Sequence, residues 1–83
     1  MIEELECELT REIEERWFAG ETIQGINFYL NDAVSITLGP HSGEGGAVIS
    51  LLRLNPEPEY LIELGSGLGD IEVFQSHLVK CGT

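Results

Sequence analysis

The sequence has few basic residues and a large excess of acidic ones. Its 83 residues include four Lys and Arg residues against fifteen Asp and Glu residues, which gives a formal net charge of −11. A field of this sign repels phosphate groups, so we expect neither nucleic acid nor an anionic membrane surface as a direct partner. A basic protein surface is the natural complement of such a charge.

The sequence also lacks the segments that mark secreted or membrane-bound proteins. No run approaches the roughly 18 to 20 apolar residues that a membrane span requires, and residues 1–4 show neither a basic nor an apolar signal region. The two cysteines, Cys7 and Cys81, lie at opposite ends, with no C-x-x-C spacing and no histidine at a metal-ligand interval. We therefore expect a cytoplasmic, bacterial-type protein with two reduced thiols and no zinc site.

The first predicted element is an amphipathic helix over residues 2–18. Apolar side chains recur there at steps of three and four, which places them in one stripe on the helix surface. The opposite side carries glutamates, and Gly20 is expected to end the helix. The stripe consists of Ile2, Leu5, Leu9, Ile13 and Trp17, and the glutamates include Glu8, Glu12 and Glu15.

Strand patterning follows the helix. Residues 23–30 and 34–38 both alternate apolar and polar side chains, which is typical of strands. For both apolar faces to lie on the same side, the connecting loop must be odd in length, so we expect a three- or five-residue hairpin loop that pairs Phe28 with Ile36. Residues 39–46, with four glycines and a proline, are predicted to form the longest loop.

Two further strands, 47–54 and 59–64, flank a proline turn. Because Pro56 lies in a short connection, we expect these strands to run antiparallel, with Leu51 opposite Ile62. The remaining segment, residues 71–79, has two interpretations. β-branched and aromatic residues favour a strand with Val73 opposite Ile62, whereas a helix would be capped by Asp70. We favour the strand.

These elements predict an α+β fold in a single domain over residues 1–83, with an N-terminal amphipathic helix packed on a four- or five-stranded antiparallel meander sheet. The outline resembles cystatin-like folds. In the predicted pairing, Leu52, Leu61 and Phe74 form an apolar row on the sheet face that the helix does not cover, with Val48 nearby. Such a row needs a cover, which could be a C-terminal helix, a second copy of the chain or a different protein.

Residues 63–69 read E-L-G-S-G-L-G directly after an apolar run. An acidic residue followed by glycines at alternate positions resembles the first motif of Rossmann-like S-adenosylmethionine-dependent methyltransferases. The resemblance implies a cofactor loop at Gly65, Gly67 and Gly69. The alternative is a chain reversal, because glycine adopts positive φ readily and only fourteen residues follow, whereas a nucleotide-binding sheet continues through further strand and helix units.

The two histidines give little support for catalysis. Neither His41 nor His77 has a neighbouring nucleophile with an orienting carboxylate. His41 together with Glu44 could hold a metal ion, but a solvated loop histidine is the favoured interpretation. We therefore expect no catalytic, cofactor-binding or metal-binding residues.

The sequence predicts a small acidic, non-enzymatic protein-binding module that docks a basic partner, as toxin-neutralising or regulatory proteins do, and that can also form a homodimer. Two alternatives remain open: a small-molecule site of the S-adenosylmethionine type at residues 65–69, and a structural role in an assembly. The candidate interface residues are Leu52, Leu61, Phe74, Val48, Glu8, Glu12 and Glu15.

Overall fold

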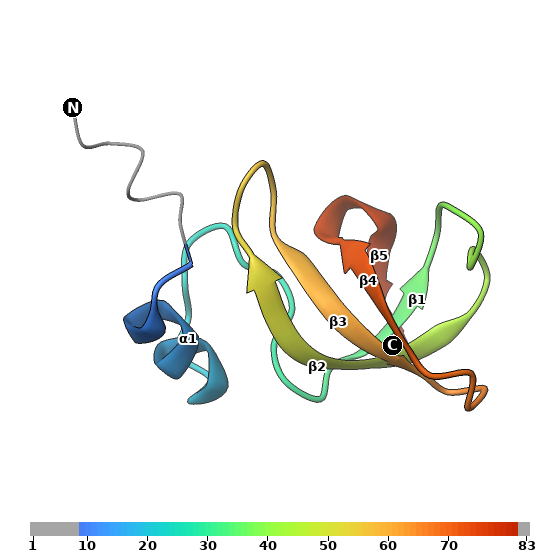
Figure 1. Cartoon of the computed structure of the whole chain (residues 1–83), viewed down its shortest axis with the longest axis horizontal. Helices are drawn as coiled ribbons and strands as arrows, with labels where there is room; N and C mark the ends of the chain where they lie inside the picture. The colour runs from blue at the N-terminus through green and yellow to red at the C-terminus, as the bar shows by residue number, and fades with distance from the viewer. Residues whose placement is uncertain (1–8, 82–83) are drawn as a thin grey trace.

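The computed structural model describes residues 9–81 and shows an α+β fold with an antiparallel sheet (Figure 1). The strand order in the sheet is β4-β3-β2-β1-β5, and neighbouring strands are antiparallel. The predicted class is thus confirmed. The elements, in chain order, are α1 (Arg11–Phe18), β1 (Ala33–Ile36), β2 (Gly45–Arg53), β3 (Glu59–Leu64), β4 (Asp70–Phe74), the short 3-10 helix η2 (Gln75–His77) and β5 (Leu78–Lys80).

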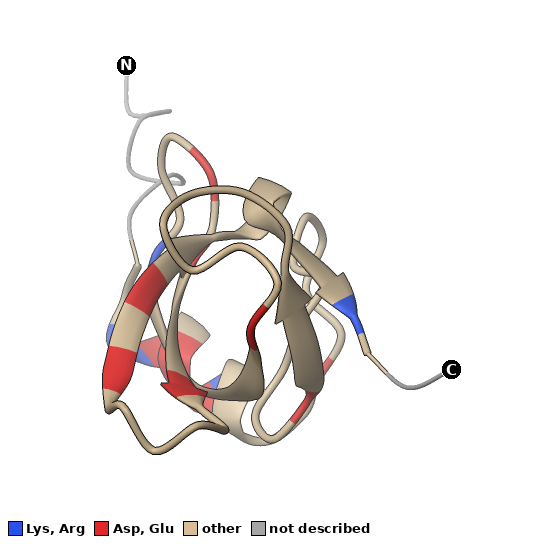
Figure 2. Ribbon diagram, turned by 90° about the vertical axis from the view of Figure 1, so that its right-hand side faces the viewer, with Lys and Arg blue, Asp and Glu red and all other residues tan. Residues whose placement is uncertain are grey.

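The sheet curls around its own apolar face and forms an open barrel (Figures 1 and 2). The pairing of β2 with β3 shifts between Val48 and Ser50 and again between Leu51 and Arg53. Such bulges bend a strand and increase its twist, which helps a long strand to follow a curved sheet. The buried core consists of Trp17, Ile26, Phe28, Val34, Ile36, Val48, Leu51, Tyr60, Ile62, Leu64, Val73 and Leu78.

The antiparallel pairing of β2 with β3 through the proline turn is confirmed, but the predicted register is wrong. Leu51 lies opposite Tyr60, and Val48 lies opposite Ile62, where the sequence predicted Leu51. Each bulge places one additional residue on β2, so the register drifts along the strand pair. Val48 consequently faces the core.

The segment 71–79 contains two strands rather than one. β4 pairs with β3, with Val73 opposite Tyr60 where Ile62 was predicted. η2 follows directly, and β5 then pairs with β1 at the other edge of the sheet. The preferred strand interpretation is therefore confirmed for β4 and wrong for residues 75–77, which form the 3-10 helix.

Residues 19–32 form coil and turns, so the predicted strand 23–30 and its hairpin with 34–38 are wrong. β1 pairs with β2 and β5 instead. Ile26 and Phe28 are nevertheless buried, with an exposed residue between them. The alternation in the sequence thus reflected burial on one side of an extended coil and not pairing with a neighbouring strand.

In this coil, side chains form the hydrogen bonds to backbone groups that a neighbouring strand would otherwise form. The indole N–H of Trp17 donates to the carbonyl oxygen of Phe28 at 2.9 Å, and the backbone N–H of Tyr29 donates to Oδ2 of Asp32 at 2.8 Å. Backbone groups that are satisfied by nearby side chains do not require a ladder of hydrogen bonds to a second strand. This local pairing explains why a strand-like sequence forms no strand.

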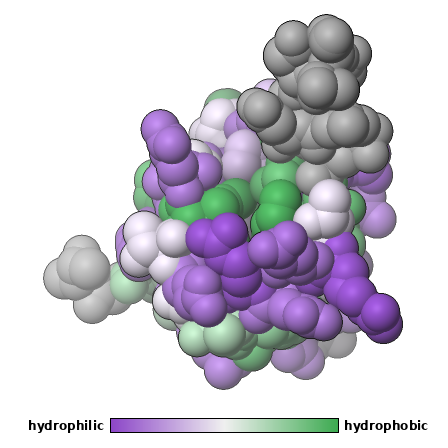
Figure 3. Space-filling model, turned by 90° about the vertical axis from the view of Figure 1, so that its left-hand side faces the viewer, coloured by the Kyte–Doolittle hydropathy of each residue, from purple (hydrophilic) through white to green (hydrophobic). Residues whose placement is uncertain are grey.

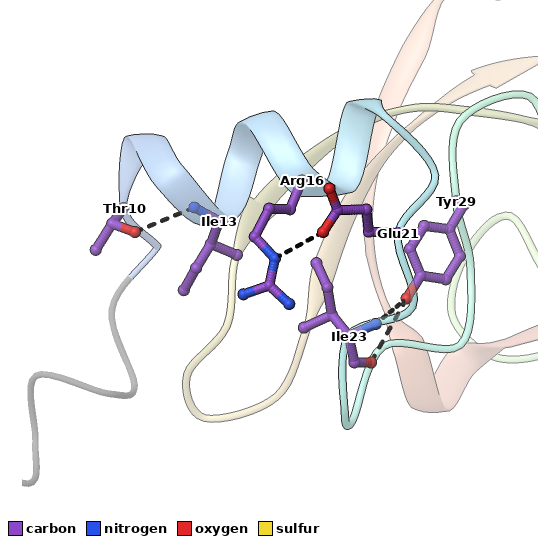
Figure 4. A network of polar contacts seen from close by, with 6 residues as sticks. All are labelled: Thr10, Ile13, Arg16, Glu21, Ile23 and Tyr29. Carbon is purple, nitrogen blue, oxygen red and sulfur yellow. Dashed lines mark hydrogen bonds and ion pairs between the residues drawn. The ribbon is translucent and has the colours of Figure 1, made fainter.

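α1 begins later than the sequence predicts. Thr10 is extended, and its hydroxyl oxygen accepts a hydrogen bond from the N–H of Ile13 at 3.2 Å (Figure 4). A threonine in this role is an N-cap, which marks a helix start at Arg11. Residues 2–8 of the predicted helix lie outside the described residues.

α1 lies beside one end of the barrel rather than across the sheet (Figure 1), so the cystatin-like outline is wrong. Trp17 is the buried residue of α1.

Polar contacts stabilise the coil after α1 (Figure 4). Nε of Arg16 donates to Oε1 of Glu21 at 3.1 Å, and the hydroxyl oxygen of Tyr29 accepts from the N–H of Ile23 at 2.7 Å.

Candidate functional site

The apolar residues predicted to form an interface row are not aligned across the strands. On the outer face of the sheet, Leu61 lies opposite Glu72, and Phe74 lies opposite Glu59. Leu52 lies at the second bulge of β2. All three apolar side chains are half-buried. The drift in register therefore separates side chains that the predicted pairing had placed side by side.

The other predicted interface residues lie apart from this face. Val48 is fully buried in the core, so it offers no surface to a partner in this fold. Glu12 and Glu15 are exposed on α1, at the end of the barrel away from β4 (Figure 1). Glu15 pairs with Arg11, with 3.9 Å between Oε2 and Nε. Glu8 lies outside the described residues.

A groove lies at the open side of the barrel, between β4 and the loop 37–44 that follows β1; we call it the β4 groove. β4 is an edge strand, so no strand pair closes the space between it and the loop. The groove has a volume of about 300 Å³. It is lined by Ile36, Leu38, Gly39, Pro40, His41, Ile71, Glu72, Val73, Phe74 and His77.

The β4 groove has an apolar floor and a partly charged rim. Ile71 and Val73 come from the inner face of β4, and Ile36 comes from the end of β1. Leu38, at the loop, is 56% exposed although it is a large apolar residue. Apart from the two histidines, Glu72 is the one ionisable residue in the lining. An apolar surface with a few placed polar groups is typical of binding sites.

The loop 37–44 is held in a defined conformation. The N–H of Gly43 donates to the carbonyl oxygen of Ile36 at 2.8 Å, which closes the loop on β1. The N–H of Thr37 donates to the carbonyl oxygen of His77 at 2.8 Å, which joins the loop to η2. Gly43 adopts φ +94°, a conformation that residues with a side chain rarely adopt. The loop on one side of the groove is thus bonded to η2, which directly follows β4 on the other side.

Gln75 fixes η2 against the rest of the fold. Its side-chain oxygen accepts hydrogen bonds from the hydroxyl group of Tyr60 at 2.5 Å and from the N–H of Asn27 at 2.9 Å. Its amide nitrogen donates to the carbonyl oxygen of Gly25 at 3.1 Å, and its backbone N–H donates to that of Pro58 at 2.8 Å. Burial raises the pKa of Tyr60 from 10.0 to about 12, so its phenol stays protonated, and can donate to Gln75, further into the alkaline range than an exposed tyrosine would.

The two histidines of the chain both line the β4 groove. Nδ1 of His41 lies 3.2 Å from Oε2 of Glu44, and the ring of His77 stands edge-on to Phe74 with 6.3 Å between ring centroids. Within residues 9–81, no group of three or more metal-ligating side chains gathers. The groove therefore offers apolar contact, a carboxylate and two imidazoles, which are groups suited to recognition.

Residues 65–69 form the turn of the β3-β4 hairpin. The N–H of Leu64 donates to the carbonyl oxygen of Gly69 at 3.0 Å, and Gly67 and Gly69 have positive φ. In a nucleotide-binding fold such a loop leads from a parallel strand into a helix, whereas here it leads into an antiparallel neighbour. The chain reversal is confirmed, and the likeness to methyltransferases does not extend beyond the motif.

A second apolar surface lies beside α1, in a cleft lined by Ile13, Ile23, Gln24, Gly25, Ile26, Leu54 and Pro58. Figure 3 shows this side of the molecule, where apolar areas are separated by hydrophilic side chains.

Sequence reasoning named Phe74 as an interface residue but missed the groove to which it belongs. Leu38, Pro40 and His41 lie in or beside the predicted long loop, and His77 lies in the predicted last strand. These segments are far apart in the chain, and the pairing of β5 with β1 brings them together. One signal was present in the sequence, namely a proline and a histidine inside a glycine-rich loop.

None of the helices among residues 9–81 has the length and apolar character needed to cross a bilayer. Comparisons of the chain with models of protein families, with curated proteins and with solved structures found no match.

Proposed function

We propose that this protein is a non-enzymatic protein-binding module that docks a basic segment of a partner protein in the β4 groove. The observation that carries the proposal is the groove itself: an apolar floor, an exposed leucine at its loop and a carboxylate on β4. A toxin-neutralising or regulatory role in the cytoplasm, which the sequence predicts, is part of the same proposal.

The distribution of charge supports a basic partner. Each of the four basic side chains lies within 4 Å of a carboxylate of the same chain, so its field is largely cancelled. By contrast, Glu63, Asp70 and Glu72 lie on the β3-β4 hairpin with no Lys or Arg at ion-pair distance among the described residues. Figure 2 shows acidic segments recurring along this side of the barrel. Such a surface attracts a basic chain and accelerates its association.

The apolar groups of the groove support a partner with an apolar anchor. Binding energy at protein interfaces concentrates in a few side chains that fill apolar pockets, while rim charges contribute selectivity and association rate. Leu38, Ile71 and Val73 can contact one or two apolar side chains of a partner, and Glu72 can pair with a flanking cation. The preferred ligand is therefore a segment that combines basic and apolar residues.

The direct test is a titration with short synthetic peptides, followed by the amide chemical shifts of the ¹⁵N-labelled protein. The probe is an acetylated and amidated peptide in which lysine and valine alternate, and the matched probe replaces each lysine with glutamate. We expect shifts at residues 38–41 and 71–77 with the basic peptide only, and weaker binding at high salt because exposed charges are screened.

Two leucine variants give a matched control. Leu38 and Leu68 are both exposed in glycine-rich turns, at 56% and 73%, but only Leu38 lines the groove. We expect Leu38→Ser to weaken binding of the basic peptide about tenfold and Leu68→Ser to leave it unchanged. Shifts confined to α1, equal binding of both peptides, or no binding at all would contradict the proposed function.

A further inference from the structure

We infer that the basic segment binds as an additional antiparallel strand on the open edge of β4, an inference that rests on the proposed function. Proteins commonly recognise extended peptides by adding a strand to an exposed sheet edge, where main-chain hydrogen bonds give affinity and alternate side chains give specificity. β4 is such an edge, and the β4 groove runs alongside it.

The hydrogen-bond pattern shows which peptide groups of β4 are free. In an antiparallel pair, every second residue pair exchanges both hydrogen bonds, and the residues between them direct their N–H and C=O groups to the other side. The N–H of Leu64 donates to the carbonyl oxygen of Gly69, and the N–H of Gln75 donates to that of Pro58. These two bonds lie just beyond the two ends of a register without bulges. They therefore determine, for every residue of β4, whether its peptide groups point toward β3 or toward the open edge.

By this alternation, Ile71 and Val73 exchange hydrogen bonds with β3, whereas Asp70, Glu72 and Phe74 direct their peptide groups to the open edge. Among the described residues, no other backbone or side-chain group bonds to the peptide groups of Glu72. β4 therefore presents an unused set of main-chain donors and acceptors at the groove.

The side-chain faces of an added strand follow from the same geometry. A partner residue opposite Glu72 would exchange two hydrogen bonds with it and would lie on the same, outer face of the sheet. The next residue along would lie on the inner face, beside Ile71 and Val73 on the apolar floor. A segment that alternates basic and apolar residues would thus place its cations beside Glu72 and its apolar side chains in the groove.

The acidic residues of β4 favour this occupant over a second copy of the chain. If two β4 edges paired, Asp70 and Glu72 of one copy would face carboxylates of the other, and like charges on adjacent strands are destabilising. Charged side chains on an edge strand are a common protection against self-pairing. The same charges stabilise a strand that carries lysine or arginine on its outer face.

Backbone methylation of the probe peptide tests the inference with the unmodified protein. In the alternating lysine and valine peptide, the lysine N–H groups face β4 if the strand adds antiparallel, and the valine N–H groups face away from it. We expect N-methylation of the lysine residues to weaken binding about tenfold or more, and N-methylation of the valine residues to leave it nearly unchanged. Protection of the Glu72 amide from hydrogen exchange should accompany binding of the unmethylated peptide.

Two substitutions at Glu72 distinguish the contribution of its charge to binding from the contribution of its backbone N–H group. Glu72→Gln removes the carboxylate and keeps the N–H group, whereas Glu72→Pro removes both, at an edge position where proline is compatible with a strand. We expect Glu72→Gln to weaken binding about threefold, and Glu72→Pro to weaken it about tenfold further. Amide spectra of both variants establish that the sheet is intact, and the methylated peptides remain decisive if Glu72→Pro does not fold.

The outcomes distinguish the inference from the proposed function. If both methylated peptides bind as well as the parent peptide in the β4 groove, the function stands and strand addition is wrong. Loss of binding on methylation of the valine residues alone would indicate parallel addition and would overturn the antiparallel arrangement. If no basic peptide binds, or if the protein is a dimer that pairs through β4, both the inference and the proposed function are wrong.

Discussion

The indole N–H of Trp17 donates a hydrogen bond of 2.9 Å to the carbonyl oxygen of Phe28. Trp17 is fully buried and stacks on Tyr29, with 6.2 Å between ring centroids and 20° between planes. It is the buried residue of α1, so this one side chain joins the helix to the core and also satisfies a backbone carbonyl of the following coil. Attachment of the helix therefore depends on both the bulk and the polarity of Trp17.

Trp17→Phe retains an aromatic ring but removes the donor, so the carbonyl oxygen of Phe28 is left without this partner. We expect the free energy of unfolding to fall by about 1 to 3 kcal/mol, and by about 3 to 5 kcal/mol for Trp17→Ala. Urea denaturation followed by far-UV circular dichroism measures both values. The control is Phe18→Ala, which removes a ring that is 49% exposed and should cost about 1 kcal/mol or less. Equal losses for Trp17→Phe and Phe18→Ala would show that the hydrogen bond contributes little.

The strands of the β2-β3-β4 meander were predicted well from local patterns. β3 has the predicted bounds of 59–64, and its antiparallel pairing with both neighbours follows from the proline turn and the glycine turn. The register was off by two residues for Leu51 and Val73, which leaves these two side chains on the predicted face, whereas Val48 lies in the core and not near the outer row. The two bulges of β2 depend on the curvature of the whole sheet, and no local pattern in the sequence encodes them.

The coil before β1 and the β4 groove were not predictable from periodicity. Ile26 and Phe28 alternate as in a strand, but the backbone of the coil bonds to the side chains of Trp17 and Gln75, which lie outside the coil, and of Asp32 at its end. The groove likewise joins a loop and an edge strand that are distant in sequence. The coil depends on hydrogen bonds from particular side chains, and the groove depends on the pairing of β5 with β1. Periodicity reports only which face of a segment is buried, so it reveals neither.

Adjacent glycines at the start of β2 have different packing constraints. A Cβ atom on Gly46 would lie 2.8 Å from Cγ2 of Ile62 and would also collide with the carbonyl oxygen of Glu63, a backbone atom that cannot easily move. A Cβ atom on Gly45 would have its nearest neighbour at 3.4 Å, in the backbone of β1. Of these two glycines, Gly46 is the one that lies so close to β3 that no room is left for a side chain.

We therefore expect Gly46→Ala to lower the free energy of unfolding by about 2 to 3 kcal/mol, because the overpacked strands must separate. The matched variant Gly45→Ala should change it by less than about 1 kcal/mol, since the nearest contact is tight but tolerable. Thermal denaturation of both variants under the same conditions provides the comparison. The packing argument would fail if the two alanine variants unfolded at the same temperature.

Gln75 is the polar residue on which the position of η2 depends. Gln75→Ala removes the acceptor of Tyr60 and of the Asn27 N–H, and it also removes the donor to Gly25. We expect a loss of about 1 to 3 kcal/mol in the free energy of unfolding, because at least one partially buried group is left unsatisfied. The control is Ser76→Ala, whose hydroxyl group bonds only to the carboxylate of Glu57 at an exposed site.

The same substitution should alter the groove. With Gln75→Ala, we expect the amide signals of His77 and Thr37 to broaden or move, because η2 holds the loop 37–44 through the hydrogen bond between these residues. Ser76→Ala should leave these two signals in place. Unchanged signals in Gln75→Ala would mean that the backbone bonds alone fix the groove.

Tyr60 makes the stability of the fold sensitive to alkaline pH. Burial disfavours the phenolate and raises the pKa of Tyr60 from 10.0 to about 12 in the folded state. The unfolded chain releases this proton first, so the stabilisation is complete below pH 10 and is lost as the pH rises through 12. Because the hydroxyl group bonds to Gln75, which is only half-buried, the phenolate would be partly screened, and we expect a total loss of about 1 to 2 kcal/mol.

Urea denaturation at a series of pH values from 9 to 12 measures this dependence. The control is Tyr60→Phe, which lowers the stability at every pH because it removes the bond to Gln75, but which has no phenol to titrate. The difference in free energy of unfolding between the wild type and Tyr60→Phe should therefore shrink above pH 10, where the unfolded wild type begins to ionise. A difference that stays constant up to pH 12 would show that the buried phenol has an ordinary pKa, and that Tyr60 is better solvated than its place in the core indicates.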